Sequence, residues 1–483
     1  MNIYTIIITV YFAGVVLVSL LTKRMASKSS SDFLIAGRNL GVMVCAVVVA
    51  SEWLGGMSTI GVSERAFTSG TLQPILYNIA TSLGMIIIGF SVAFHYRTRN
   101  VHTVSEMLEH LFGKRAGIVS ASAFLIAYII LAYVQIQTCA SVIAPLFNID
   151  WLQAVLISSV IITIYTYVGG MYALSITGVI HVITMFTGLG IALIVGLGKL
   201  GGFSGLHSHL TAVGSPDNLF NPFSGGLSAA FSLLLGGVLG GMAGQASIQP
   251  IFAAKNPATA KKAAIVSSLI IAPFGFIIGN LGLIAKTGQF FDTAGINPKM
   301  ALPTLLTTSS FIHPVLGGIA LAGIIAAILS TVGPVNFAVV TIGTKDVYQI
   351  FFNKSGDDRQ ILRMAKNFVI LVNVITIPLA IIFRGGILDM AYVSYAIRGI
   401  GAIVIIMGIY RRKWITVTGV RWAFIGGTIV IFICLIAQHY GWFYIDKTYG
   451  AIVSALIFIT LGTLWDKIKK NPDILPEEGN HEE

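Results

Sequence analysis

The chain has 483 residues, of which 55% are hydrophobic and only 10% are charged, and its mean hydropathy is +0.87. A soluble protein of this length needs far more charge to solvate its surface, so the composition indicates a polytopic membrane protein. The net charge of +11 does not indicate a nucleic-acid partner, because the basic residues lie in short connections between apolar segments.

Thirteen apolar stretches, each long enough to cross a bilayer, follow one another along the chain. The first has no basic region before it and no small-residue cleavage site after it, so it is expected to be a retained helix. The predicted spans are 3–22, 41–63, 72–95, 116–141, 153–170, 175–198, 226–252, 263–285, 313–344, 367–383, 387–409, 415–437 and 448–464. The sequence therefore predicts an all-α protein with a single membrane domain, residues 1–465, and an acidic disordered tail, residues 466–483.

The connections between the spans differ in their content of lysine and arginine. One set of alternate connections holds 22 basic residues, and the other set holds six. Lysine and arginine prefer cytoplasmic connections. The bias predicts a multi-pass plasma-membrane protein whose amino terminus lies outside and whose carboxyl terminus and tail are cytoplasmic.

Glycines interrupt the second and the seventh spans. In the second, Glu52 stands just before a glycine pair at 55–56, and in the seventh five glycines lie between 236 and 244. A broken helix with an ionisable residue at mid-depth is tolerated only where protein or a solvated cavity replaces lipid. Four further spans follow each broken one, as in an inverted repeat whose halves each open on a discontinuous helix. The predicted repeats cover about 41–198 and 226–409.

Four motifs, in order along the chain, carry a resemblance to a known family. They are Asp32–Gly41 before the second span, Tyr165–Met171 after the fifth, Gln245–Pro250 in the seventh, and Leu329–Thr331 followed by Thr344–Tyr348 in the ninth. Over roughly residues 1–465 the chain resembles the sodium:solute symporter family. The resemblance implies a LeuT-type core of ten helices, with one extra helix before it and two after it. It also implies sodium-driven uptake of a small solute.

A sodium site is predicted where the ninth span meets the break in the second. Na⁺ prefers hard oxygen ligands, which hydroxyls and the carbonyls of a broken helix supply. Ala327, Ser330 and Thr331 stand at i, i+3 and i+4 and so share one helix face. By position they match the family's sodium-binding residues, and the resemblance adds the carbonyls of Ser51 and Leu54. The alternative is that both hydroxyls bond back to carbonyls of their own helix.

The sequence departs from the family pattern at a second sodium site. Gly178 stands where many members carry an aspartate, and Gly333 and Pro334 stand where they carry hydroxyl residues. Gly55 replaces the expected hydroxyl on the second span. Because a site without these oxygens cannot hold a cation, we expect one coupled Na⁺ per transport cycle.

Two ionisable residues inside the predicted spans are the main candidates for binding the solute. A charge at the bilayer centre costs roughly 2.5–3.5 kcal/mol or more, so Glu52 and Arg398 each indicate function. Arg398 is expected to bind a substrate carboxylate, or to pair with Glu52 in the empty site; a purely structural pair is the alternative. A carboxylate or amino-acid-like solute is therefore favoured. Residues flanking the breaks complete the candidate solute site: Trp53, Met57, Ser58 and Gln245.

Other functions have weaker support in the sequence. His181 could titrate near neutral pH, so a proton-coupled permease of the same fold is an alternative, as is a transporter-like sensor. A phosphate-binding loop and catalytic groupings are absent, and the three cysteines lack metal-ligand spacing. We therefore expect no enzyme activity and no cofactor beyond Na⁺ as the coupling ion. The expected partners are the solute, Na⁺ and the lipid bilayer, with no obligate protein partner and no nucleic acid.

Overall fold

The computed structural model of the protein describes residues 3–26, 39–99, 101–350, 352, 358–383 and 385–469. The predicted tail from residue 470 onward and the part of the first motif before residue 39 lie outside the described residues. Within the described ranges the chain is helical, and its β pairing is an isolated bridge between Leu40 and Ala254. The all-α class predicted from the sequence is confirmed.

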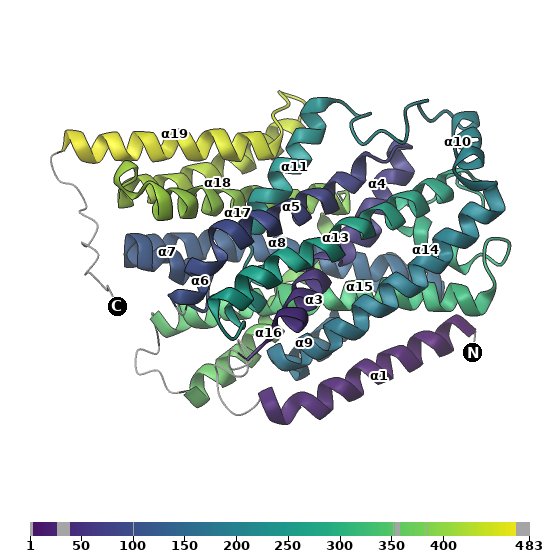
Figure 1. The fold of residues 1–483 in the computed structure, drawn as a ribbon, viewed down its shortest axis with the longest axis horizontal. Helices are drawn as coiled ribbons and strands as arrows, with labels where there is room; N and C mark the ends of the chain where they lie inside the picture. The colour runs from purple at the N-terminus through teal and green to yellow at the C-terminus, as the bar shows by residue number, and fades with distance from the viewer. Residues whose placement is uncertain are drawn as a thin grey trace.

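Figure 1 shows the helices lying lengthwise beside one another, with the start of α1 and the end of α19 at opposite ends of the bundle. The helices, in chain order, are α1 (Ile3–Ala26), α3 (Val42–Trp53), η2 (Met57–Gly61), α4 (Val62–Ser69), η3 (Gln73–Ile75), α5 (Leu76–Ser91), α6 (Ala93–Thr98), α7 (Val104–Phe112), α8 (Lys114–Phe147), α9 (Trp151–Leu200), α10 (Gly202–Ala212), α11 (Leu227–Met242), α12 (Gln245–Phe252), α13 (Pro257–Lys286), η4 (Pro298–Met300), α14 (Ala301–Thr307), α15 (Pro314–Thr341), η5 (Ile342–Gln349), α16 (Asp358–Ile382), α17 (Ile387–Tyr410), η6 (Arg412–Trp414), α18 (Val417–His439) and α19 (Lys447–Ile468). The helices before and after the predicted core lie at its edges: α1 packs on α9 and α15, while α18 and α19 pack together and against α17.

The helices agree with the predicted spans. Among the described residues, nine helices are long and apolar enough to cross a membrane, and two bent helix pairs raise the number to 11. Two shorter apolar helices, Ile3–Val18 and Trp151–Tyr167, occupy the two remaining predicted spans. Every predicted span thus contains an apolar helix, and the total of thirteen stays a prediction.

Both predicted helix breaks are present. The axes of α3 and of the following segment Met57–Ser69 differ by 54°, and those of α11 and α12 differ by 43°. Glycine is required in the first break because a Cβ atom at Gly55 would lie 1.5 Å from Oγ1 of Thr331 on α15. The break at Leu54–Gly56, called the α3 break below, therefore lets two helices approach more closely than side chains would permit.

Helix α9 contains two predicted spans and folds back between them. The hydroxyl of Tyr165 lies 3.2 Å from that of Thr177 and 3.5 Å from Nε2 of His181. A straight helix would separate residues 165 and 181 by about 24 Å along its axis, which two side chains cannot bridge. Helix α9 is therefore sharply bent between Trp151–Tyr167 and Ser175–Leu200, and two separate spans at this place stay a prediction.

Helix α7 lies outside the candidate spans and begins with a reciprocal cap. Thr103 Oγ1 accepts a hydrogen bond from the backbone N–H of Glu106 at 2.9 Å. The Glu106 carboxylate in turn accepts from the backbone N–H of His102 at 2.6 Å and lies 3.4 Å from Nδ1 of His102. Two backbone donors at the start of the helix are thus satisfied by side chains.

The cap predicts a pH-dependent loss of stability for Glu106→Gln. Burial raises the pKa of the Glu106 carboxyl, but hydrogen bonds from His102 and the charges of His102 and His110 outweigh it, so the pKa lies below its ordinary value. A depressed folded-state pKa adds stability above the unfolded-state pKa and loses it as pH falls through the folded value. We therefore expect a lower thermal midpoint at pH 7 and a shrinking deficit below about pH 4. Melting curves of Glu106→Gln and of the control Glu109→Gln measure this, and an equal deficit at both pH values would contradict it.

Candidate cation and solute site

The α3 break lies against α15, and hydrogen bonds connect the two helices. Ser330 Oγ donates to the Ser51 carbonyl at 2.6 Å and also lies 2.8 Å from the Ala327 carbonyl on its own helix. Thr331 Oγ1 donates to the Glu52 carbonyl at 2.7 Å. All five residues are buried. We call Ser51, Glu52, Ala327, Ser330 and Thr331 the cation cluster, because it gathers hydroxyl and carbonyl oxygens from two helices.

Four of the five predicted sodium-binding residues belong to this cluster. Leu54, the fifth, follows the end of α3, and its backbone N–H donates to the Ala50 carbonyl at 2.9 Å. Thr331 contacts the carbonyl of Glu52 rather than that of Leu54. Glu52 thus contributes a backbone oxygen, whereas the sequence predicts a role only for its carboxylate.

The hydroxyl of Thr331 bonds across to α3 rather than back to its own helix, which argues against the alternative of purely local bonding. Gly178 lies beside this region, since a Cβ atom there would stand 2.9 Å from Oγ of Ser51. A side chain at position 178 would meet Ser51 and Val48 on α3. Because both Gly178 and Gly55 lack side chains, neither adds an oxygen there.

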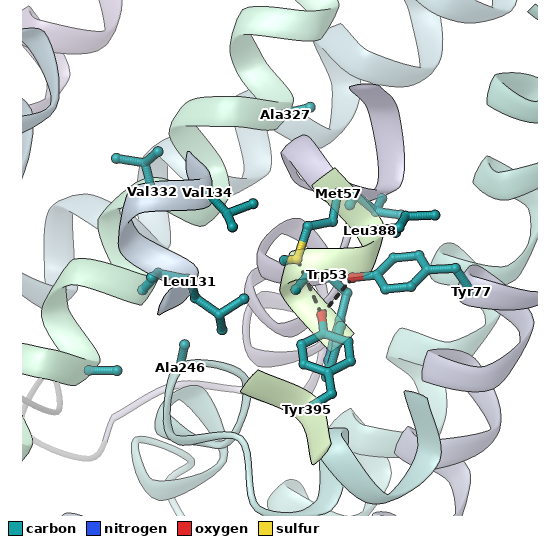
Figure 2. Packing of buried hydrophobic residues seen from close by; sticks show 14 of the residues in the cluster. Trp53, Met57, Tyr77, Leu131, Val134, Ala246, Ala327, Val332, Leu388 and Tyr395 are labelled. Carbon is teal, nitrogen blue, oxygen red and sulfur yellow. Dashed lines mark hydrogen bonds between the residues drawn. The ribbon is translucent and has the colours of Figure 1, made fainter. Parts of the chain in front are cut away.

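Trp53 and Met57, on either side of the α3 break, pack in a buried group that Figure 2 shows from close by. The hydroxyl of Tyr395 on α17 lies 2.8 Å from that of Tyr77 on α5 and 3.6 Å from the sulfur of Met57. The Tyr395 ring meets the Trp53 ring edge-on, with 6.0 Å between ring centres. We call these four residues the aromatic cluster. It joins both sides of the α3 break to α5 and α17.

Arg398 lies one turn beyond Tyr395 and is 2% exposed. Its Nε donates to the Gly240 carbonyl at 2.8 Å, and its Nη2 donates to the same oxygen. Its guanidinium carbon also lies 4.6 Å from the ring centre of Tyr395, 5.3 Å from that of Tyr128 and 6.0 Å from that of Trp53. Gly240 is in the last turn of α11, where cations stabilise the helix end. Arg398 therefore caps the half-helix α11 and forms one wall of the aromatic cluster.

Glu52 and Arg398 approach the same place without touching. Among the ion pairs of the described residues none joins their side chains within 4.0 Å, so the structure does not contain the direct pair. Trp53, the residue after Glu52, has its ring centre 6.0 Å from the guanidinium carbon of Arg398, so the two charged residues lie in the same region of the structure. Oε2 of Glu52 is buried and has no hydrogen-bond partner within the described part of the chain. A buried, unpartnered carboxylate oxygen needs an explanation, and a bound donor would supply one.

Three further buried polar groups near the α3 break and α17 lack partners among the described residues: both amide atoms of Gln135, Nε1 of Trp53 and Oγ of Ser394. Gln135 on α8 is directly opposite the break, since a Cβ atom at Gly56 would lie 3.0 Å from its Oε1. Gln135 is not among the solute-site residues predicted from the sequence. A glutamine within the apolar span 116–141 was the available signal, but nothing local shows which way it points.

The other predicted solute-site residues are engaged elsewhere. Gln245 Oε1 accepts from the Val104 N–H at 2.8 Å, and its Nε2 donates to the His102 carbonyl at 2.9 Å, which ties α12 to the start of α7. Ser58 accepts from Nδ2 of Asn78 on α5 at 2.5 Å. The structure therefore brings Glu52, Trp53, Met57 and Arg398 together, whereas Gln245 serves as an anchor.

His181, the candidate for proton coupling, lies between tyrosine hydroxyls. Its Nδ1 is 2.5 Å from the hydroxyl of Tyr11 on α1, and its Nε2 is 3.5 Å from that of Tyr165. The side chain is fully buried. These contacts join α1 to both segments of α9, and they give His181 a structural role.

The sequence is similar to a family model and to several known transporters. Residues 33–427 match the model of the sodium:solute symporter family. The chain is 25% identical to the sodium/proline symporter of Salmonella typhimurium over 489 residues, which cover 97% of this chain and 94% of that one. It is 23% identical over 403 residues to the osmoregulated proline transporter OpuE of Bacillus subtilis, covering 79% of each. It is 24% identical over 359 residues to the human high affinity choline transporter 1, covering 70% of this chain but only 59% of that one.

Solved structures share the fold. A Na⁺-coupled sialic acid symporter, in a substrate-bound outward-open state, superposes with a TM-score of 0.78 at 20% identity, covering 96% of this chain and 98% of that one. Mhp1, a nucleobase-cation-symport-1 family transporter in a closed conformation, gives 0.59 at 15% identity, covering 92% and 96%. These likenesses confirm the LeuT-type fold predicted from the sequence.

Proposed function

Because the chain belongs to the sodium:solute symporter family, we propose that it imports a small zwitterionic solute by alternating access, together with one Na⁺ per cycle. Family membership makes the chain a transporter and not an enzyme. The observation that carries the proposal is the cation cluster, in which two hydroxyls of α15 bond to carbonyls beside the α3 break. The proposal places the protein in the plasma membrane with its amino terminus outside and its carboxyl terminus in the cytoplasm.

The cation cluster suits Na⁺ by its chemistry. Its donors are hydroxyl and backbone carbonyl oxygens, the hard ligands that Na⁺ prefers, and no thiol or imidazole takes part. The Ser330 and Thr331 hydroxyl oxygens and the Ser51 and Ala327 carbonyls would hold the ion, and the Glu52 carbonyl or the Leu54 carbonyl would complete the set. Because the ion joins α3 to α15, its binding would favour the conformation in which these helices touch.

One Na⁺ per cycle follows from the glycines beside the cluster. No side chain fits at position 55, and position 178 supplies no carboxylate, so neither position adds a side-chain oxygen for a second cation. One positive charge moving down a potential of 100 mV releases about 2.3 kcal/mol, before any concentration gradient is counted. That energy supports accumulation of a neutral zwitterion by about 40-fold, because each factor of ten requires about 1.4 kcal/mol.

The proposed solute class is based on the hydrogen-bonding groups of Glu52 and Arg398 that the protein leaves available. Oε2 of Glu52 accepts no hydrogen bond from the described residues, which suits an ammonium group. Arg398 uses its Nε and Nη2 on Gly240, and a guanidinium carries five N–H donors, so others are left for a carboxylate. The two side chains are close but unpaired, so a molecule with one charge of each sign would satisfy both. The unpartnered atoms of Gln135 and Trp53 would add neutral hydrogen bonds.

Two of the three relatives agree with this class by name, since they are proline transporters, whereas the third is a choline transporter. Proline is a zwitterion, and choline is a cation without a carboxylate. Proton coupling through His181 is not favoured, because tyrosine hydroxyls lie within 3.5 Å of both ring nitrogens.

The experiment that tests the proposed function is a matched ligand screen. Purified protein is heated with zwitterions, with their decarboxylated amines and with their deaminated acids, each in NaCl and in equimolar KCl. We expect stabilisation by a zwitterion in NaCl and a much smaller shift with either half-molecule or in KCl, since ligand and ion bind together. Uptake into proteoliposomes with radioactive Na⁺ then gives the stoichiometry. Stabilisation independent of Na⁺, or two Na⁺ per solute, would contradict the proposal.

A further inference from the structure

An apolar crevice of about 270 Å³ lies on the side of α15 that faces away from the α3 break. Helices α1, α8, α9 and α15 form its walls. α1 packs on α9 and α15, and the crevice separates it from α8. The residues lining it are apolar except for Thr9 and Cys139, and none of them carries a charge.

The crevice continues into the surface that faces the bilayer. Phe147, at the end of α8, lines it and is 50% exposed, and Val10, next to Thr9 on α1, is 67% exposed. Cys139 and Ile143 lie deeper, and each is 8% exposed. Its opening is therefore in contact with lipid tails, and its depth is within the helix bundle.

Chemistry restricts what can fill this space. Water does not, because an apolar cavity with few polar partners stays dry. A lipid headgroup does not, because the lining offers no charge and almost no hydrogen-bond donor. A linear hydrocarbon chain from the adjacent bilayer matches both the lining and the opening, and it restores the dispersion contacts that the wall atoms would otherwise lack.

The position of the crevice connects it to the cation cluster. Ile328 and Leu329 line its floor, and each is 1% exposed. They lie in the same helical turn as Ala327, Ser330 and Thr331, whose oxygens face α3. One turn of α15 is thus held between the α3 break on one side and the crevice on the other.

We propose that this crevice binds one acyl chain of a membrane phospholipid, which supports the Ala327–Thr331 turn from behind and so strengthens sodium binding. The proposal gives the helix before the core a function, because α1 forms the outer wall of the lipid site. It extends the proposed function and does not depend on which solute is carried.

Photo-crosslinking tests the binding itself. The full-length protein is reconstituted with a phospholipid that carries a diazirine in the middle of one acyl chain, and adducts are mapped by peptide mass spectrometry. We expect a dominant adduct on residues 139–147 of α8 and 325–329 of α15. Ile143→Trp, which places an indole in the crevice, should remove this adduct, while the control Val160→Trp, at a position 59% exposed on α9, should retain it. Labelling spread evenly over the exposed apolar residues, or unaffected by Ile143→Trp, would overturn the proposal.

A sodium titration tests the coupling. Delipidated protein is titrated with NaCl, with and without added phospholipid, and the thermal midpoint is recorded. The quantity compared is the NaCl concentration that gives half of the shift in thermal midpoint. Added lipid should lower this concentration severalfold in the wild type and in Val160→Trp, and it should not change this concentration in Ile143→Trp. An equal response to lipid in Ile143→Trp, or no response in the wild type, would refute the coupling. If the cation cluster does not bind Na⁺ at all, the wild type shows no NaCl shift while the crosslink persists, which separates that failure from this one.

Discussion

Replacing Gly55 with alanine is expected to abolish sodium-dependent uptake. The new Cβ atom would lie 1.5 Å from Oγ1 and 2.3 Å from Cβ of Thr331, so rotating the threonine side chain cannot relieve the clash. Helices α3 and α15 would have to separate, and both hydroxyls would leave the carbonyls beside the α3 break. Loss of even one oxygen ligand leaves the coordination shell of Na⁺ incomplete, so we expect sodium binding to weaken by about tenfold or more, which corresponds to about 1.4 kcal/mol.

Matched variants separate this effect from general misfolding. Gly190→Ala on α9 is the control, because nothing lies within 4 Å of its added Cβ atom. The pair Gly55→Ala with Thr331→Gly removes the clash and the hydroxyl together. It should recover thermal stability without recovering the response to NaCl. Sodium-dependent uptake that survives in Gly55→Ala, measured as the difference between NaCl and KCl in proteoliposomes, would refute this role of the cation cluster.

The cation cluster shows how far local sequence patterns can reach. The spacing of Ala327, Ser330 and Thr331 places three groups on one helix face, and the α3 break shows where free carbonyls occur. Both signals are local, so both could be seen before the fold was known. The packing of α3 against α15 determines which carbonyl each hydroxyl contacts. The bonded residues are 279 positions apart in the sequence. For that reason the Glu52 carbonyl could not be predicted.

The sequence alone does not determine the role of three polar residues: Arg398, Gln135 and Gln245. Each is a polar residue in an apolar span, and the sequence does not distinguish a residue that faces the solute from one that closes a helix end. Arg398 caps α11 through Gly240, 158 positions away, and Gln245 meets the loop before α7, 143 positions away at His102. Gln135 has no such partner in the part of the chain that the structure describes, and the packing of α8 against Gly56 shows which way it points.

Neutralising either of the two buried charges, Glu52 or Arg398, is expected to change which solutes bind. Each charge would hold a different end of the zwitterion. Glu52→Gln should weaken binding of the zwitterion by about 10- to 100-fold and leave binding of the deaminated acid nearly unchanged. Arg398→Gln should have the opposite selectivity, with the loss falling on solutes that carry a carboxylate. Arg398→Lys keeps the charge but lacks the planar fork, so it should restore only part of the affinity.

Comparing the decarboxylated amines with the deaminated acids makes this test independent of the structural role of Arg398. Losing the cap on Gly240 would weaken all ligands alike, whereas loss of a carboxylate partner would weaken acids and zwitterions but spare amines. Asp466→Asn is the matched control for Glu52→Gln, since Asp466 is also buried with an unpartnered carboxylate oxygen but lies on α19. Competition assays in saturating NaCl give the affinities. A uniform loss for every ligand class in both variants would show that Glu52 and Arg398 hold the helices and do not select the solute.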